Sequence, residues 1–181
     1  MYQAIAVIEL KSIARGIEAA DAALKSAGVR LISSHASCPG KYEIILTGNI
    51  SDVTAATEVV RTRFDDRMID SCVIGRIDPQ VITALFGTQA SDKRGALGII
   101  EAYSAASTIK AADIAVKTAK VTVHEPRLSR GMGGKGMVLV VGDVGDVTAA
   151  VEAGAQYAQE QGLFCNSAVI AAPHAELWEQ L

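Results

Sequence analysis

The sequence predicts an α/β (α+β) protein made of two tandem domains, each a ferredoxin-like β-α-β-β-α-β unit with a short tail helix. The stretch from Ala4 to Val29 recurs from Ala96 to Val121, an offset of 92 residues, with 13 of 26 positions identical. That period is too long for a solenoid repeat and suits a whole small domain. Each copy also shows the same order of apolar strand patterns and amphipathic helix patterns.

In the first repeat, local signals place each element. Ser12 is expected to cap the first helix and Gly28 to end it, and Ser51 with Asp52 is expected to cap the second helix. A turn at 37–40 joins two strands into a hairpin. The expected elements are strand 4–10, helix 12–28, strand 29–35, strand 41–48, a helix from 51, strand 68–74 and a short helix at 79–86.

The second repeat follows a turn-rich linker at 87–95, so the domains are expected at 1–90 and 91–181. Beyond the second hairpin loop the offset becomes 94, which aligns Lys41 with Lys135. The two copies therefore differ most at this loop, where function tends to sit on a retained scaffold. The expected elements are strand 96–101, a helix from 104, a strand from 121, loop 129–134, strand 136–142, a helix from 146, strand 164–170 and a helix through 178.

Composition excludes several functional classes. The net charge of −3 and the absence of a Lys/Arg run argue against nucleic-acid binding. No apolar run reaches membrane-spanning length, and the first residues lack a signal-peptide pattern, so a cytoplasmic protein is expected. Three cysteines without CxxC spacing fit a reducing compartment. No nucleophile–base pair, acid pair or phosphate loop emerges, so no enzyme is expected, and domains of this size favour oligomerisation.

Several short motifs then carry a resemblance. Ile8-Glu9 ends the first strand, Ala19-Ala20-Asp21 and Lys25 lie on the first helix, and Gly142-Asp143-Val144 leads into a helix of the second half. They resemble the shell proteins of bacterial microcompartments, and the double match resembles their tandem-domain, trimer-forming class. The resemblance implies two BMC domains per chain and a pseudohexameric homotrimer that tiles with other shell proteins around encapsulated enzymes. It also implies that the hairpin loops line a central pore.

Cys38-Pro39-Gly40-Lys41 at the first hairpin tip is similar to the iron–sulfur shell protein of propanediol-utilising compartments. That similarity implies one [4Fe-4S] cluster per trimer, held by Cys38 of three subunits, with electron or cluster transfer across the shell and an encapsulated redox enzyme as a partner. Pro39 would stiffen the loop, and Gly40 would let backbone N–H groups approach sulfur. The alternative is an ordinary cysteine in a turn.

The remaining pore-loop residues follow from the same resemblance. Glycines in the second loop would let three copies crowd around the axis and would offer backbone N–H groups to an anion or cluster. A flexible turn is the alternative for this loop. The pore-loop residues are Ser37, Pro39, Gly40, Arg130, Gly131, Met132, Gly133 and Gly134.

The other cysteines and the histidines receive plainer interpretations. Cys72 and Cys165 lie in apolar strands and are expected to pack in the core. His35 is expected on the strand face opposite Cys38, without a ligand role. His124 and His174 have no partner spacing typical of a zinc site and are expected on the surface.

Three cationic residues are assigned to tile edges by the resemblance. Lys25 and Lys117 end the duplicated first helix, where a cation is also favourable for the helix dipole alone. Arg76 matches an edge-sealing arginine, but its counterpart in the second repeat is Ala172. Whether the edge of the second domain makes the same contacts as the first is therefore left open.

Two further functions stay open at this point. One keeps the shell tile and makes Cys38 an ordinary residue of a cluster-free metabolite pore. The other is a trimeric ferredoxin-like regulator that binds a small ligand between subunits.

Overall fold

The computed structural model describes residues 4–86, 94–128 and 131–181. Its contacts fall into two compact units, and each is described separately. The first comprises Met1–Ile77, Ser104–Ala106 and Ser129–Gly134, and the second Asp78–Tyr103, Ser107–Leu128 and Lys135–Leu181. The predicted boundary at residue 90 lies within 87–93, outside the described residues, and stays a prediction.

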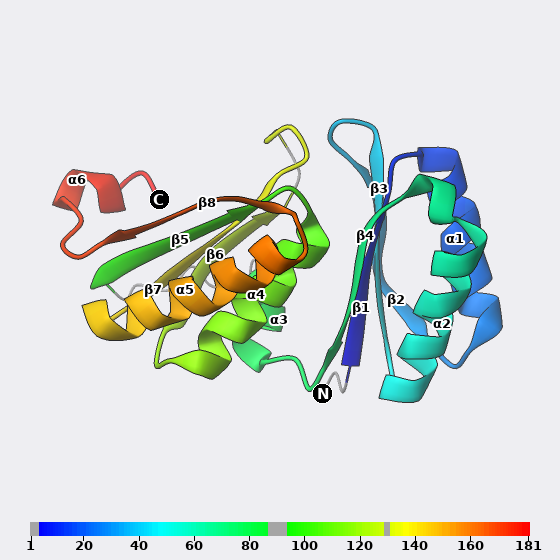
Figure 1. Ribbon diagram of the computed structural model, residues 1–181, viewed down its shortest axis with the longest axis horizontal. Coiled ribbons are helices and arrows are strands. Elements are labelled where there is room, and N and C mark those ends of the chain that lie inside the picture. Colours follow the sequence, from blue (N-terminus) through cyan, green and yellow to red (C-terminus); the bar gives the residue numbers. More distant parts are fainter. Residues whose placement is uncertain (1–3, 87–93, 129–130) are drawn as a thin grey trace. The chain divides into compact units, whose positions relative to one another are not determined.

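The first unit is a four-stranded antiparallel sheet with helices on one face (Figure 1). Apolar residues at alternate positions of the two central strands face small alanines of the helices, which lets the helices lie close to the sheet. The strand order is β2-β3-β1-β4. The elements are β1 (Ala4–Leu10), α1 (Ile13–Ser26), β2 (Arg30–Ser37), β3 (Lys41–Gly48), α2 (Ile50–Arg63), a 3-10 turn (Asp65–Arg67) and β4 (Met68–Gly75).

Helix starts in this unit confirm one prediction and correct another. Ser12 caps α1 as predicted, because its side chain accepts a hydrogen bond from the backbone N–H of Arg15 at 3.4 Å. Helix α2 starts earlier than predicted, with Asn49 at its N-cap. Asp52 therefore lies inside the first turn, where a carboxylate is favourable to the helix dipole.

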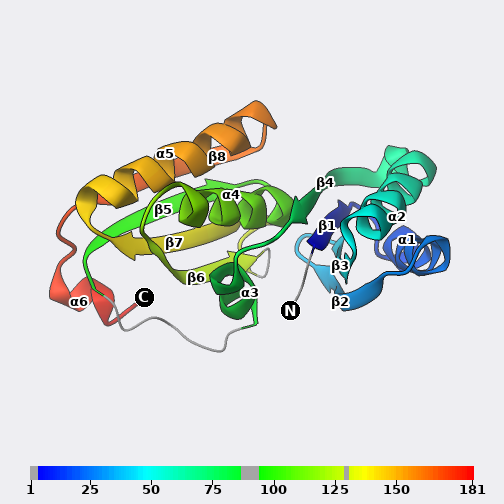
Figure 2. The same cartoon turned by 90° about the horizontal axis from the view of Figure 1, so that it is seen from below.

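The second unit repeats the same sheet, in the order β6-β7-β5-β8 (Figure 2). Helices α4 and α5 cover one face, and Trp178, the last residue of the short helix α6, packs on the other face with Leu97 and Leu139. Helix α3, predicted as the tail of the first repeat, packs against β6. The elements are α3 (Pro79–Leu85), β5 (Ala96–Ala102), α4 (Ala105–Thr118), β6 (Thr122–Leu128), β7 (Gly136–Gly142), α5 (Val144–Glu160), β8 (Phe164–Ile170) and α6 (Ala175–Trp178).

The duplication extends to irregularities of the backbone. The β2–β3 register shifts between Leu31 and Ser33, and the β6–β7 register shifts at the equivalent place, between Val123 and Glu125. A bulge inserts a residue on one strand and bends it, so shared bulges mark a shared backbone. The predicted fold class, two copies of one α/β unit, is confirmed.

The predictions for the cysteines other than Cys38, and for two of the histidines, are confirmed in part. Cys72 is buried, as predicted, and its thiol donates to the Ala106 carbonyl at 3.4 Å. Cys165 is only half-buried, because the β8 strand that carries it lies at the sheet edge. The surface prediction for His124 is wrong: it is buried, with its ring edge-on to Trp178 at a centroid distance of 5.8 Å. His174 is exposed, and its Nδ1 caps α6.

Candidate functional site

The predicted site is the tip of the β2–β3 hairpin. The two strands pair as far as Ser37 and Lys41, which leaves Cys38, Pro39 and Gly40 as the turn. The Gly40 N–H donates to the Ser37 carbonyl at 3.0 Å, and Gly40 has φ +84, a left-handed conformation that suits glycine. The Cys38 side chain is exposed. A closed turn thus presents one thiol to solvent.

The second predicted loop reaches this turn through Gly134. The Lys41 ammonium donates to the Gly134 carbonyl at 2.9 Å. A Cβ atom on Gly134 would lie 3.0 Å from Pro39 Cδ and 3.1 Å from the Cys38 carbonyl oxygen, so only glycine allows this close approach. The structure therefore brings together Cys38, Pro39, Lys41 and Gly134.

The other predicted loop residues differ in exposure. Gly131 and Gly133 are exposed, with φ +73 and φ +62, and a Cβ at either would meet nothing within 4 Å. Met132 is half-buried, whereas Ser37 is buried and its hydroxyl has no hydrogen-bond partner among the described residues. Arg130 lies outside the described residues.

Glu9, Glu43 and Lys41 form a charged layer next to this turn. The Lys41 Nζ also lies 3.5 Å from Oε1 of Glu9, a fully buried carboxylate of β1. Burial raises the pKa of Glu9 from 4.5 to about 7, Lys41 lowers it, and Glu43 raises it further. The second repeat has the equivalent pair, Lys135 with Glu101 at 3.3 Å, and this hydrogen bond raises the pKa of Lys135.

Sequence reasoning missed the layer, although a signal was present. Glu9 and Glu43 interrupt otherwise apolar strand runs at positions that pair across β1 and β3. A charged residue in such a run is seldom fully buried without a partner. His35, which was not expected to be a ligand, lies 3.5 Å from Glu43 and contacts this layer.

The donor set of one chain does not suffice for a metal cluster. Within 4–86, 94–128 and 131–181, no three His, Cys, Asp or Glu side chains gather as a metal site. Iron–sulfur clusters usually take four cysteine ligands, and this tip supplies one. Cluster binding here therefore requires thiols from several chains.

The predicted tile-edge lysines occupy equivalent places on two helices. Lys25 pairs with exposed Asp21 at 2.7 Å on α1, and Lys117 pairs with buried Asp113 at 2.6 Å on α4. Asp113 also accepts a hydrogen bond from the Asp78 N–H at 2.9 Å. Arg76 is exposed after β4, with φ 49. Their role at tile edges stays a prediction.

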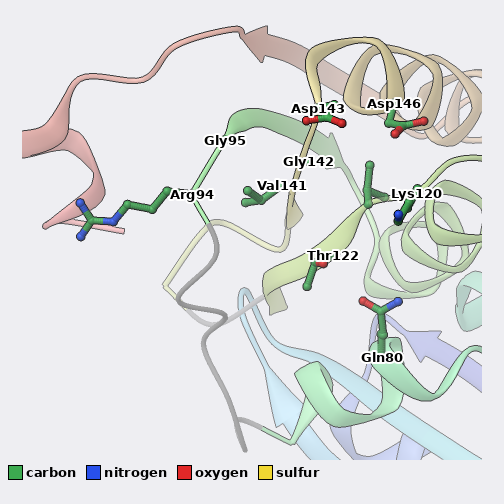
Figure 3. A pocket seen from close by; sticks show the side chains of 10 residues that line it. Gln80, Arg94, Gly95, Lys120, Thr122, Val141, Gly142, Asp143 and Asp146 are labelled. Carbon is green, nitrogen blue, oxygen red and sulfur yellow. The ribbon is translucent and has the colours of Figure 1, made fainter.

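A pocket of about 470 Å³ lies in the second unit, at the start of α5 (Figure 3). Its charged lining residues are two cations and two carboxylates, and Figure 3 shows Arg94 pointing away from Asp143 and Asp146. None of its lining residues is Ser, Cys or His. The pocket thus carries charges of both signs and no strong excess of either.

No helix of the described residues is long and apolar enough to cross a membrane.

Comparison with known proteins gives relatives that match along the whole chain. Bacterial microcompartment shell protein PduT of Citrobacter freundii is 42% identical over 181 residues, covering 100% of this chain and 98% of that protein. Carboxysome assembly protein CcmO of Synechococcus elongatus is 29% identical over 192 residues, covering 98% of this chain and 68% of that protein.

Two solved structures are also similar to this chain. A microcompartment protein from Desulfitobacterium hafniense superposes with a TM-score of 0.85 at 40% identity, covering 99% of both chains. A fused, permuted hexameric shell protein from the RMM microcompartment gives a TM-score of 0.63 at 22% identity, covering 86% of this chain and 81% of that one, and shares the fold. The BMC domain family matches residues 4–77 and again residues 96–173. The chain therefore belongs to the BMC-domain family of bacterial microcompartment shell proteins, with two copies of the domain in one polypeptide.

Proposed function

We propose that this chain is a structural tile whose homotrimer places six BMC domains around one axis, beside other shell proteins. The hairpin loops line the pore at that axis, and Cys38 of three subunits holds one [4Fe-4S] cluster there. The observation that carries the proposal is the single exposed thiol on a turn tied to a glycine loop of the second repeat. The full-length similarity to PduT supports it.

A difference between the repeats supports self-association. Ile13 and Ile17 on α1 are 43% and 55% exposed, whereas their equivalents on α4, Ala105 and Ile109, are fully buried. Exposed apolar residues at i and i+4 form one stripe on a helix and indicate an interaction surface. A second copy of the chain is the occupant that we propose for this stripe.

The donor chemistry fits a cluster only in the oligomer. Each chain offers one accessible thiol at the tip, so three chains offer three sulfur ligands and leave one iron to another ligand. When bound, such a cluster accepts and releases one electron. Pro39 restricts the turn, and Gly40 leaves its backbone open on the exposed side, which allows N–H groups near sulfur. An encapsulated redox enzyme is the partner that we propose for electron transfer.

Anaerobic purification with iron and sulfide analysis tests the cluster. We expect about four irons for every three wild-type chains and their loss in Cys38→Ser. Cys165→Ser is the matched control, because that thiol is half-buried on β8 and should leave iron content unchanged. Iron and sulfide retained in Cys38→Ser would contradict the assignment.

The two alternatives give different results. A cluster-free metabolite pore predicts an iron-free trimer even after anaerobic purification. A ligand-binding regulator predicts trimers that never form sheets. Electron microscopy at high protein concentration tests whether sheets form.

If Lys25 and Arg76 join tiles, sheets of the wild type should shorten or vanish in Lys25→Ala, while native mass spectrometry should still detect the trimer.

A further inference from the structure

Four titratable residues form one row across the first sheet. His35 of β2 pairs with Glu43 of β3, Glu43 pairs with Glu9 of β1, and Glu9 pairs with Asp70 of β4. Directly opposed residues of antiparallel strands project to the same face. The row therefore gathers three carboxyl groups and one imidazole on the face opposite α1 and α2.

The two central carboxyl groups are the most deeply buried. Glu9 is 0% exposed and Glu43 is 1% exposed. Among the described residues, Oε1 of Glu43 has no hydrogen-bond partner, and Oε1 of Glu9 has none beyond its ion pair with Lys41 at 3.5 Å. A buried acceptor without a donor is costly, and a protonated carboxyl supplies a donor where an ionised one cannot.

Two basic side chains lie beside the two central carboxyl groups. Lys41 lies 3.5 Å from Glu9, and the His35 Nε2 lies 3.5 Å from Glu43. Two neutral donors also contact the row: the Ala106 N–H donates to Glu9 Oε2 at 3.4 Å, and the Ser104 hydroxyl donates to Asp70. Carboxylates that share a low-dielectric site do not all ionise together, so one of them retains a proton.

We propose that Glu9 and Glu43 form a buried binding site for a single proton, beneath the lysine that ties the two hairpin loops. The proton is held near neutral pH, because burial raises the pKa of Glu9 to about 7 and nearby Glu43 and Asp70 also raise it, against Lys41 and the Ala106 amide. The site lies in the first repeat only, since the equivalent row in the second is Arg127, Met137, Glu101 and Asn166.

Proton binding has a consequence for Lys41. Its ammonium lies between Glu9 and the Gly134 carbonyl. Protonation of Glu9 removes the negative charge at one end, which weakens the ion pair that holds the lysine. The strength of the contact that Lys41 makes between the two loops thereby depends on pH, whether or not a metal cluster is bound.

Infrared titration of the full chain from about pH 5 to about pH 9 tests the proposal, because a protonated carboxylic acid has a distinct carbonyl band. We expect one band that disappears near neutral pH. Glu9→Gln should abolish it, Glu43→Gln should move its midpoint to lower pH, and Lys41→Met should move it to higher pH. Glu101→Gln, the equivalent change in the second repeat, should leave it unchanged.

Two results would overturn the proposal: no carboxylic-acid band that titrates near neutral pH in the wild type, or a band with an unchanged midpoint in Glu9→Gln. If Glu9→Gln does not fold, as judged by circular dichroism, the decision passes to the other variants. Opposite midpoint shifts in Glu43→Gln and Lys41→Met then support the site, and unchanged midpoints in both overturn it.

Discussion

In the first repeat, Gly16 of α1 lies against Tyr42 of β3, whereas in the second repeat Thr108 of α4 lies against Gly136 of β7. These are equivalent positions, and the large and small partners are exchanged between helix and strand. A Cβ on Gly16 would overlap the Tyr42 side chain, and a Cβ on Gly136 would overlap that of Thr108. The two copies thus keep the same helix-to-sheet spacing while the volume that fills it comes from opposite sides.

The row of titratable residues across the first sheet also differs from its equivalent in the second repeat. Here the chemistry of the side chains changes, whereas the pairing of the strands is the same. Glu9 and Glu101 each pair with a lysine, and that lysine lies two residues before the strand residue opposite the glutamate, which is Glu43 in β3 and Met137 in β7. Glu43 is an acid beside Glu9, whereas Met137 is apolar beside Glu101. Only the first repeat therefore concentrates buried acid, which makes the second a natural control for it.

The largest expected effect comes from the exchanged pair. Gly16→Thr alone should destabilise the protein by about 3 kcal/mol or more, because the added side chain has no room beside Tyr42. Adding Tyr42→Gly, which copies the second repeat, should recover part of that loss through a coupling of about 1 to 3 kcal/mol. Urea denaturation of both variants measures the difference.

Gly145→Ala is the matched control for this pair, because a Cβ there meets nothing within 4 Å. Its unfolding midpoint should stay near the wild-type value or rise slightly. Additive losses in the double variant would show that the two repeats do not use the same contact.

The next effect is the pH dependence of stability that Glu9 contributes. Its pKa is raised on folding from 4.5 to about 7, so the folded state binds a proton more tightly than the unfolded state does. The resulting stabilisation, about 3 kcal/mol at most, is fully present below about pH 4.5 and is lost as the pH rises through about 7.

Denaturation at several pH values, compared between wild type and Glu9→Gln, isolates this contribution. The difference in unfolding free energy should change by up to that amount across the window. Glu101→Gln should give a profile parallel to wild type, and a flat difference for Glu9→Gln would show that Glu9 titrates alike in both states.

A smaller effect is expected from the paired lysines. Lys41→Met should cost about 1 to 2 kcal/mol, because the Gly134 carbonyl and buried Glu9 both lose a charged donor. Lys135→Met should cost less, since Glu101 is partly exposed and water replaces the lysine. Equal losses, measured by thermal unfolding, would remove this distinction between the repeats.

The smallest effects concern the helix-end ion pairs. Lys117→Ala should cost about 1 kcal/mol because it leaves buried Asp113 without its cation. Lys25→Ala should cost about 0.3 kcal/mol, since both members of its pair are exposed. Thermal unfolding of the two variants gives the order, and a larger loss for Lys25→Ala would reverse the comparison.

Much of the fold could be predicted from residue patterns. The apolar pattern of 4–10 indicated a strand, the turn at 37–40 indicated a hairpin with strand 41–48, and Ser12 marked a helix start, because these signals act over a few neighbouring residues. The start of α2 was misplaced, since Asn49, Ser51 and Asp52 are all good caps and local chemistry does not choose among them. His124 was misplaced because its partner, Trp178, lies far along the chain.

The candidate site divides in the same way. The exposed turn at Cys38 followed from Pro39 and Gly40 alone. The contact between Lys41 and Gly134 did not, because it joins residues 93 positions apart. The Glu9–Glu43 pair required the register of two strands whose side chains meet only in the folded sheet.

By itself, the sequence determined the duplication, the order of strands and helices, and the turn that presents one thiol, because each depends on repetition or on neighbouring residues. The tertiary structure alone decided which carboxyl groups are buried and which lysine faces them. Burial and electrostatics depend on groups brought together through space, and chain proximity does not reveal them.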